Sequence, residues 1–142
     1  MREVFLDSDV LIDFLVGRKP FSIDAMKLIE YGHKRDLKIS VSTLSMSHIH
    51  YLIGRFEGKK SAGMKIKEIL KIVEVLSVHR STIESAAYSD FHDFEDAIQN
   101  YIAEENSITN LITRNVKDYS SSNLSIQTPR EFIRDFENRK SS

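Results

Sequence analysis

Short apolar segments alternate with longer segments of helical periodicity along the whole chain, and this alternation constrains the fold most. The strand-like segments are rich in Val, Ile and Leu, whereas the segments between them repeat apolar residues every three or four positions. Parallel strands need long crossovers that usually contain a helix, so this order predicts an α/β domain with a mainly parallel sheet of four to five short strands flanked by helices. The expected strands are residues 4–6, 37–41, 75–78, 111–112 and 124–127, and the expected helices are residues 10–16, 21–34, 43–58, 61–74, 81–89, 94–104 and 129–137.

The composition fits a single globular domain over residues 1–142, with 41% hydrophobic and 29% charged residues. No apolar run approaches the roughly 18 residues of a membrane span, and no signal-peptide pattern opens the chain, so we expect a cytoplasmic protein without a membrane partner. Because the chain has no cysteine, a metal would take oxygen or imidazole ligands. The net charge of −1 implies that a polyanionic substrate is held by local basic patches or bound cations.

Two carboxylates, Asp7 and Asp9, interrupt the apolar pattern in FLDSDVLID, where the first expected strand ends. In open α/β sheets the ligand site lies beyond the carboxyl ends of the strands. The segment ITRNVKDY follows the expected strand at residues 111–112 and therefore reaches the same edge of the sheet. It contributes polar side chains from Thr113, Arg114, Asn115 and Asp118.

A third acidic group lies on the expected helix of residues 94–104, in the segment DFHDFEDAIQ. Asp93, Asp96 and Asn100 fall within about 60° of one another on a helix, because positions i, i+3 and i+7 share a face. The opposite face is apolar, with Phe94, Ile98, Tyr101 and Ile102. A helix that buries its apolar face against the sheet brings its acids toward Asp7.

Carboxylates gathered in one place repel one another, and partial burial strengthens this repulsion, so they need a proton or a cation. Mg²⁺ and Mn²⁺ are suitable because they take oxygen ligands and often bind through a few carboxylates together with water and substrate phosphates. Such ions activate water and neutralise charge on a phosphodiester. The pattern therefore predicts phosphoryl transfer or phosphodiester hydrolysis.

The segment FLDSDVLIDF resembles the opening motif of PIN domains, in which an apolar strand ends in Asp. The segments DFEDAIQNYIAEE and ITRNVKDY are similar to the second half of that family, especially to bacterial PIN proteins related to VapC toxins. The resemblance covers about residues 3–135. It implies a three-layer α/β/α fold and a metal-dependent endoribonuclease that cleaves RNA. It also implies a toxin with an antitoxin partner, and a homodimer whose apolar surface comes from residues 49–56 and 62–73.

The resemblance further implies a set of site residues. Asp7, Asp96 and Asp118 would be catalytic, and Mg²⁺ or Mn²⁺ would be held by Asp7, Asp96, Asp93, Asn115 and Asp118. The choice between Asn115 and Asp118 for the fourth acidic position stays open. His48 occupies the position where the family usually has Glu, so it would serve Mn²⁺, contact an RNA phosphate or have no catalytic role. Thr113, Arg114 and His48 would contact the substrate.

Each signal also has a purely structural interpretation. Asp7 and Asp93 fit helix N-caps, Arg114 fits an ion pair with a neighbouring carboxylate, and Asp118 fits an ordinary loop acid. Two other functions are consistent with parts of the pattern. One is a haloacid-dehalogenase-like phosphatase with Asp7 as nucleophile and Asp9 as general acid. The other is a PIN-fold module that binds RNA or protein without cleavage.

Overall fold

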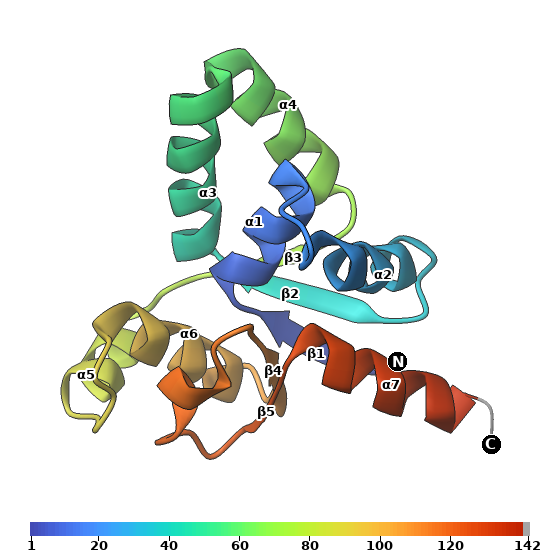
Figure 1. Ribbon diagram of the computed structural model, residues 1–142. Helices are drawn as coiled ribbons and strands as arrows, with labels where there is room; N and C mark the ends of the chain where they lie inside the picture. Colours follow the sequence, from blue (N-terminus) through green and yellow to red (C-terminus); the bar gives the residue numbers. More distant parts are fainter. Residues whose placement is uncertain (141–142) are drawn as a thin grey trace.

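The computed structural model describes residues 1–140, and its central feature is a sheet whose neighbouring strands are all parallel (Figure 1). The strand order is β3-β2-β1-β4-β5. This arrangement confirms the predicted parallel α/β architecture. The strands are β1 (Glu3–Leu6), β2 (Lys38–Ser42), β3 (Glu74–Leu76), β4 (Asn110–Ile112) and β5 (Ser125–Gln127).

Helices cover both faces of the sheet and give three layers, as expected. One face carries α1 (Ser8–Val16), α2 (Ser22–His33), α3 (Thr43–Glu57), α4 (Lys59–Leu70) and α7 (Pro129–Lys140). The other face carries α5 (Arg80–Ala87), α6 (Phe94–Glu105) and the short 3-10 helix η1 (Val116–Tyr119). Figure 1 shows α1 to α4 on one side of the sheet and α5 and α6 on the other.

Successive residues of a strand point to opposite faces, so β1 contributes to two separate hydrophobic cores. Val4 and Leu6 pack with α1, α2 and α7, whereas Phe5 packs with α6 and η1, and all three side chains are fully buried. In β2, Ser40 and Ser42 are buried, and so are the neighbouring apolar residues Ile39 and Val41. The predicted alternation of β2 is therefore not an alternation of burial, because helices cover both faces of a parallel sheet.

The connections place a topological switch point between β1 and β4, where open α/β sheets usually have a crevice, and we refer to this edge of the sheet as the crevice. The helices that lead from β1 to β2 and from β2 to β3 lie on one face, whereas α5 and α6 lead from β3 to β4 across the other face. The sheet thus grows in opposite directions from β1, and such a switch point is the usual ligand site of an open α/β sheet. Asp7 follows β1 and Thr113 follows β4 at this point.

Two sequence-based expectations on α3 and α4 need correction. The second of these helices spans Lys59–Leu70 rather than residues 61–74, because Gly58, at φ +92°, separates it from α3 and the chain enters β3 at Glu74. The apolar surface proposed for a homodimer is divided: its inner residues are buried, whereas Tyr51, Phe56 and Met64 are exposed. Ile49, Ile53, Ala62 and Ile69 are at most 1% exposed, since α3 and α4 pack against the same core.

No helix in the described part of the chain has both the length and the apolar character required to cross a membrane.

Candidate active site

Asp7 lies at the centre of the crevice and is held by groups from three elements. Its Oδ1 accepts a hydrogen bond from the Ser8 backbone N–H at 2.7 Å, so it caps α1 as well. Its Oδ2 accepts hydrogen bonds from the Thr113 hydroxyl at 2.9 Å and the Tyr119 hydroxyl at 3.0 Å. Burial raises the pKa of Asp7, and these hydrogen bonds oppose that rise. The hydrogen bonds therefore fix the carboxylate in position, although its burial disfavours an uncompensated negative charge.

The hydroxyl groups of Thr113 and Tyr119 hold the Asp7 carboxylate from inside the protein. Thr113 is 0% exposed, so its hydroxyl does not reach a substrate, and the expected phosphate contact does not fit this placement. Tyr119 is 2% exposed and was not among the residues expected at the site. The sequence shows only an aromatic residue after Asp118, and nothing local indicates that its hydroxyl turns back to β1.

Asp9 joins the start of α1 to the loop that follows β4. Its Oδ2 accepts hydrogen bonds from the Arg114 backbone N–H at 3.2 Å and from the Asn115 side-chain amide at 3.0 Å. Its Oδ1 is buried and has no hydrogen-bond partner among residues 1–140. Burial, followed by the negative charge of Asp7, raises the pKa of Asp9 to about 7. The side chain therefore orients the loop and leaves one buried oxygen unsatisfied.

The first turn of α6 separates the roles of two acids. Asp93 is exposed and caps the helix, because its Oδ1 accepts a hydrogen bond from the Asp96 backbone N–H at 2.9 Å. The Asp96 side chain forms no hydrogen bond or ion pair with any residue that the structure describes. Burial, and then the charges of Asp7, Asp93 and Asp118, raise the pKa of Asp96 to about 7. Asn100, expected on the same face, is buried and accepts a hydrogen bond from Ser122.

Asp118 and Asn115 occupy different places in the loop after β4. The negative charge of Asp118 contributes to the raised pKa of both Asp7 and Asp96, so its carboxylate lies within electrostatic reach of both. The amide of Asn115 instead donates to Asp9. This geometry favours Asp118 over Asn115 as the additional acid of the site.

The Arg114 side chain points away from the acids, as in the ion-pair interpretation. Its Nε lies 2.7 Å from Oδ2 of Asp13, which is 1% exposed and also pairs with Arg18 at 3.5 Å. The contact is an ion pair between a guanidinium and a fully buried carboxylate. The guanidinium also lies 4.1 Å from the centre of the Phe21 ring. A direct contact of Arg114 with the phosphate at the acids does not fit this placement.

The helix after β2 supplies no carboxylate to the crevice. His48 is exposed and makes no hydrogen bond or ion pair within the described residues. Ser45, one turn earlier, lies in a buried polar network: its Oγ is 2.6 Å from Oγ of Ser8 and accepts a hydrogen bond from the Gln99 amide at 2.7 Å. This network joins α3, α1 and α6 around the crevice, and no local pattern in the sequence indicates it.

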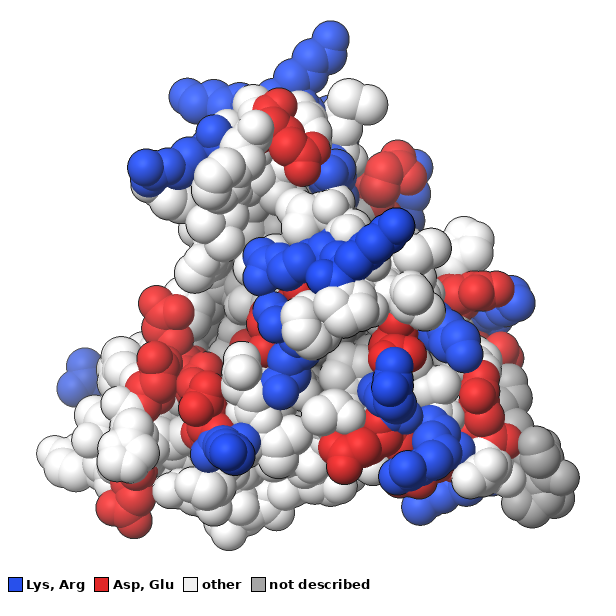
Figure 2. All heavy atoms as spheres, in the orientation of Figure 1, with Lys and Arg blue, Asp and Glu red and all other residues white. Residues whose placement is uncertain are grey.

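The acids fit a hydrated divalent cation better than a cation enclosed by protein. Among residues 1–140, no three carboxylate or imidazole side chains form a complete metal site. Mg²⁺ usually binds through one or two carboxylates and keeps several waters or substrate phosphates. The Asp96 carboxylate, which has no partner among the described residues, and the firmly positioned Asp7 carboxylate match this mode. Figure 2 shows acidic side chains gathered over the α5 and α6 region, beside the hollow that separates it from α3.

These pKa values predict how the stability of the metal-free chain depends on pH. Asp9 and Asp96 hold a proton up to about pH 7 in the folded chain, whereas a carboxyl of this type ordinarily titrates near 3.8. The folded chain thus binds these protons more tightly, and its free energy of unfolding falls as pH rises through about 7. The decline lies between these two pKa values, so thermal melts in EDTA from about pH 4 to about pH 8 are expected to show this loss. If the melting temperature of Asp96→Asn falls with pH as steeply as that of the wild type, the raised pKa assigned to Asp96 is contradicted.

A parallel sheet with carboxylates converging at its switch point defines an α/β protein with an acidic crevice between β1 and β4. Comparison with known families identifies the group: the PIN domain model matches residues 3–117, so the chain belongs to the PIN domain family. This membership replaces the phosphatase alternative, since the family model covers both the Asp7 segment and the Asp96 segment.

Individual relatives agree with this assignment. The chain is 27% identical over 138 residues to Ribonuclease VapC1 of Aquifex aeolicus (strain VF5), with 92% of each sequence covered. Its fold is similar to VapBC2 from Rickettsia felis, solved with a promoter DNA fragment, at a TM-score of 0.71 and 12% identity over 89% of this chain and 98% of that one. It is also similar to a toxin-antitoxin complex from Klebsiella pneumoniae, at a TM-score of 0.68 and 19% identity over 89% and 97%.

Proposed function

We propose that the chain is a Mg²⁺- or Mn²⁺-dependent endoribonuclease that hydrolyses phosphodiester bonds in RNA in the cytoplasm. The observation that carries this proposal is the proximity of Asp7, Asp96 and Asp118, three carboxylates from separate segments. Besides burial, the charge of Asp118 raises the pKa of Asp7, and the charges of Asp7 and Asp118 raise the pKa of Asp96. In a merely structural cluster, a buried ammonium or guanidinium group would neutralise these negative charges. The one arginine of the adjacent loop, Arg114, pairs with Asp13 instead.

Each residue has a defined part in the proposed reaction. Asp7 and Asp96 would hold the cation, with Asp118 as a further ligand directly or through water. Thr113 and Tyr119 keep the Asp7 carboxylate oriented. The divalent cation would supply activation of water and neutralisation of charge on the phosphate. The crevice between β1 and β4 would orient the RNA strand so that the phosphate meets the acids.

A second candidate function is an RNA-binding or protein-binding PIN module with little or no cleavage. His48 favours this alternative, because α3 carries an exposed imidazole at the position where the family usually has Glu. Imidazole is a poor ligand for Mg²⁺ and a better one for Mn²⁺. If the chain is a nuclease, we expect His48 to contact an RNA phosphate or to make Mn²⁺ the more effective ion.

We also propose an antitoxin partner and a homodimer. The similar Klebsiella and Rickettsia structures are described as a toxin-antitoxin complex and as VapBC2. An acidic crevice suits a partner segment that carries a cationic side chain, because such a group would satisfy the same carboxylates as the metal. Since the inner faces of α3 and α4 are buried, a homodimer would use exposed residues of these helices such as Tyr51, Phe56 and Met64.

The direct test is to incubate the purified chain with single-stranded and structured RNA in Mg²⁺, in Mn²⁺ and in EDTA. We expect endonucleolytic fragments in at least one metal and none in EDTA. Binding of RNA without any metal-dependent fragment would support the module instead.

A further prediction concerns the polar network around the crevice. Gln99 lies one turn after Asp96, and its amide bonds to Oγ of Ser45 and, at 3.1 Å, to Oγ of Ser8. Gln99→Leu is expected to lower kcat by about 10- to 100-fold, because groups that orient metal ligands have effects of that size. Gln99 acts here through Ser8, whose backbone N–H donates to Asp7. The melting temperature should change little, since Ser8 and Ser45 remain bonded to each other.

Asn106→Ala provides the matched control, because it removes one side-chain hydrogen bond, to the Ile102 carbonyl, at the opposite end of α6. Equal losses of kcat in the two variants would show that Gln99 acts only through the general stability of the helix.

A further inference from the structure

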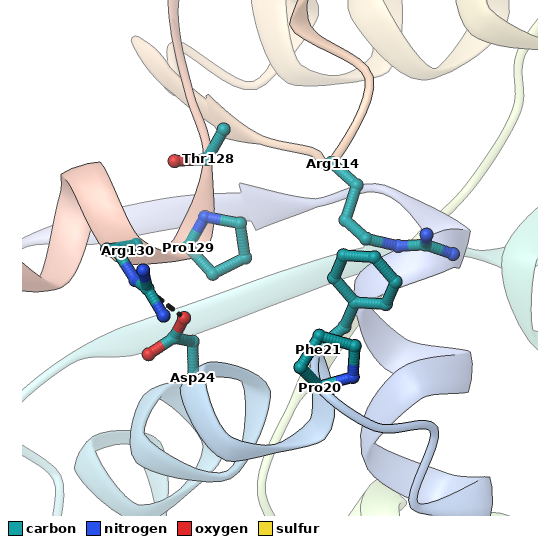
Figure 3. Close-up of a pocket in the computed structure, with 7 residues that line it drawn as sticks. All are labelled: Pro20, Phe21, Asp24, Arg114, Thr128, Pro129 and Arg130. Atoms are coloured by element: carbon teal, nitrogen blue, oxygen red, sulfur yellow. Dashed lines mark ion pairs between the residues drawn. The ribbon is translucent and has the colours of Figure 1, made fainter.

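A cavity of about 290 Å³ opens at the same edge of the sheet as the acids, on the side of α2 and α7. Its walls include Phe21 and Asp24 from the start of α2, Arg114 from the loop after β4, and Thr128 and Arg130 from the start of α7 (Figure 3). This volume is at the lower limit of ordinary ligand sites, so the cavity suits one planar group rather than a large molecule.

The strand register places this cavity beside the carboxylates. The Asp7 N–H donates to the Ile112 carbonyl at 2.9 Å, and the Thr113 N–H donates to the Gln127 carbonyl at 3.0 Å. Asp7, Thr113 and Thr128 therefore follow three adjacent strands, β1, β4 and β5, at one level. Two strand spacings separate the ends of β1 and β5, or about 10 Å. Neighbouring nucleotides of one extended strand can occupy both places.

The ring of Phe21 provides a fixed stacking surface in this cavity. It is 41% exposed, and the guanidinium of Arg114 lies 4.1 Å from its centre. Arg114 is itself paired with the buried Asp13, and this ion pair fixes the guanidinium in its position against the ring. Figure 3 shows Phe21 on one side of the cavity and Pro129 on the other. Aromatic rings and guanidinium planes are the groups on which proteins stack the unpaired bases of RNA.

The rim of the cavity carries one cation available to a phosphate. Arg130 lies 3.4 Å from Asp24, but its side chain is 83% exposed, and ion pairs in that setting are weak. The guanidinium can therefore exchange Asp24 for an RNA phosphate, which it binds with good geometry. The carboxylate of Asp24 then remains as an acceptor for an amino group at the edge of a base.

We infer that this cavity is a base-binding subsite that receives one unpaired nucleobase of the RNA strand, next to the phosphate cleaved at the acids. The base stacks on Phe21, and Arg130 contacts the phosphate that follows it. This inference rests on the proposed ribonuclease function. An RNA strand fits better than a protein segment, because the cavity combines a planar slot, two guanidinium groups and the same sheet edge as the acids.

The test is a double-mutant cycle that combines a substitution in the protein with the removal of a base from the RNA. In an Asp96→Asn background, short fluorescein-labelled single-stranded RNAs of mixed sequence carry an abasic site at each position in turn, and fluorescence anisotropy gives Kd. With Phe21 present, one abasic position is expected to weaken binding about tenfold, the size typical of one base–aromatic stack. With Phe21→Ala, that same position should have no further effect. Phe21→Tyr should restore the profile, and Phe56→Ala, an exposed aromatic of α3, should leave it unchanged.

Identical abasic profiles with and without Phe21 would overturn the inference and assign the cavity to another ligand, such as a segment of a protein partner. Cleavage by the wild type in Mg²⁺ and Mn²⁺ is measured separately. Absence of cleavage with a profile that depends on Phe21 would overturn the proposed nuclease but keep the subsite. Cleavage together with identical abasic profiles would support the proposed nuclease and overturn the subsite.

Discussion

Asp96→Asn is expected to abolish metal-dependent RNA cleavage and, at the same time, to stabilise the metal-free chain. Loss of groups that merely orient a metal ligand costs about 10- to 100-fold, so loss of a ligand should lower kcat/KM by at least about 100-fold. In EDTA the same change removes a carboxylate that Asp7 repels, and whose pKa is raised to about 7. The gain at pH 8 should be about 1–2 kcal/mol, because the partial exposure of Asp96 screens part of the effect.

Asp93→Asn is the matched control for this variant. It neutralises a carboxylate three residues away, and asparagine caps a helix as well as aspartate does. We expect Asp93→Asn to retain most of the cleavage and to melt close to the wild type. A loss of less than about tenfold in Asp96→Asn, or an equal loss in Asp93→Asn, would show that Asp96 is not a ligand. Rates on one RNA and calorimetry with and without Mg²⁺ provide both readouts.

Arg114→Ala is expected to lower the free energy of unfolding by about 3 kcal/mol, the largest effect on stability that we foresee. The substitution leaves the Asp13 carboxylate, 1% exposed, with only the 3.5 Å contact to Arg18. Removing one member of a buried ion pair is costly because the remaining charge stays desolvated. Burial already raises the pKa of Asp13 while Arg114 opposes that rise. Urea unfolding at neutral pH measures the loss.

Two further variants isolate the cause. Arg18→Ala removes the more exposed partner of Asp13, and we expect it to cost less than about 1 kcal/mol. Asp13→Asn combined with Arg114→Ala removes both charges and should recover part of the stability. A double variant no more stable than Arg114→Ala would mean that the loss comes from the Phe21 stack rather than from the stranded charge.

The fold could be predicted from the sequence because its information is local. Each short apolar segment became a strand, and Gly17 at φ +69° ends α1 as expected from its position. Asp7 and Thr113 could be assigned to one edge of the sheet because parallel strands present their carboxyl ends together. The apolar residues of α3 and α4 proposed for a dimer surface are buried in part and exposed in part, since a helical pattern shows which face is apolar but not what covers it.

The details of the site could not be predicted because they depend on contacts between distant segments. Thr113 is buried under Asp7, and Tyr119 returns to the same carboxylate across 112 residues of sequence. The network of Ser45 with Gln99 joins residues 54 positions apart. Such partners are short polar or aromatic residues with many possible roles, and only the folded arrangement selects one of them.

The central claim is that Asp7 and Asp96 share one divalent cation. A crystal structure of the wild-type chain with Mn²⁺, with data that record the anomalous signal of manganese, tests it most directly. We expect one anomalous peak in the crevice between β1 and β4, with a carboxylate oxygen of Asp7 and one of Asp96 each about 2.1 Å away. A peak bound by other residues, or no peak at saturating Mn²⁺, would contradict it.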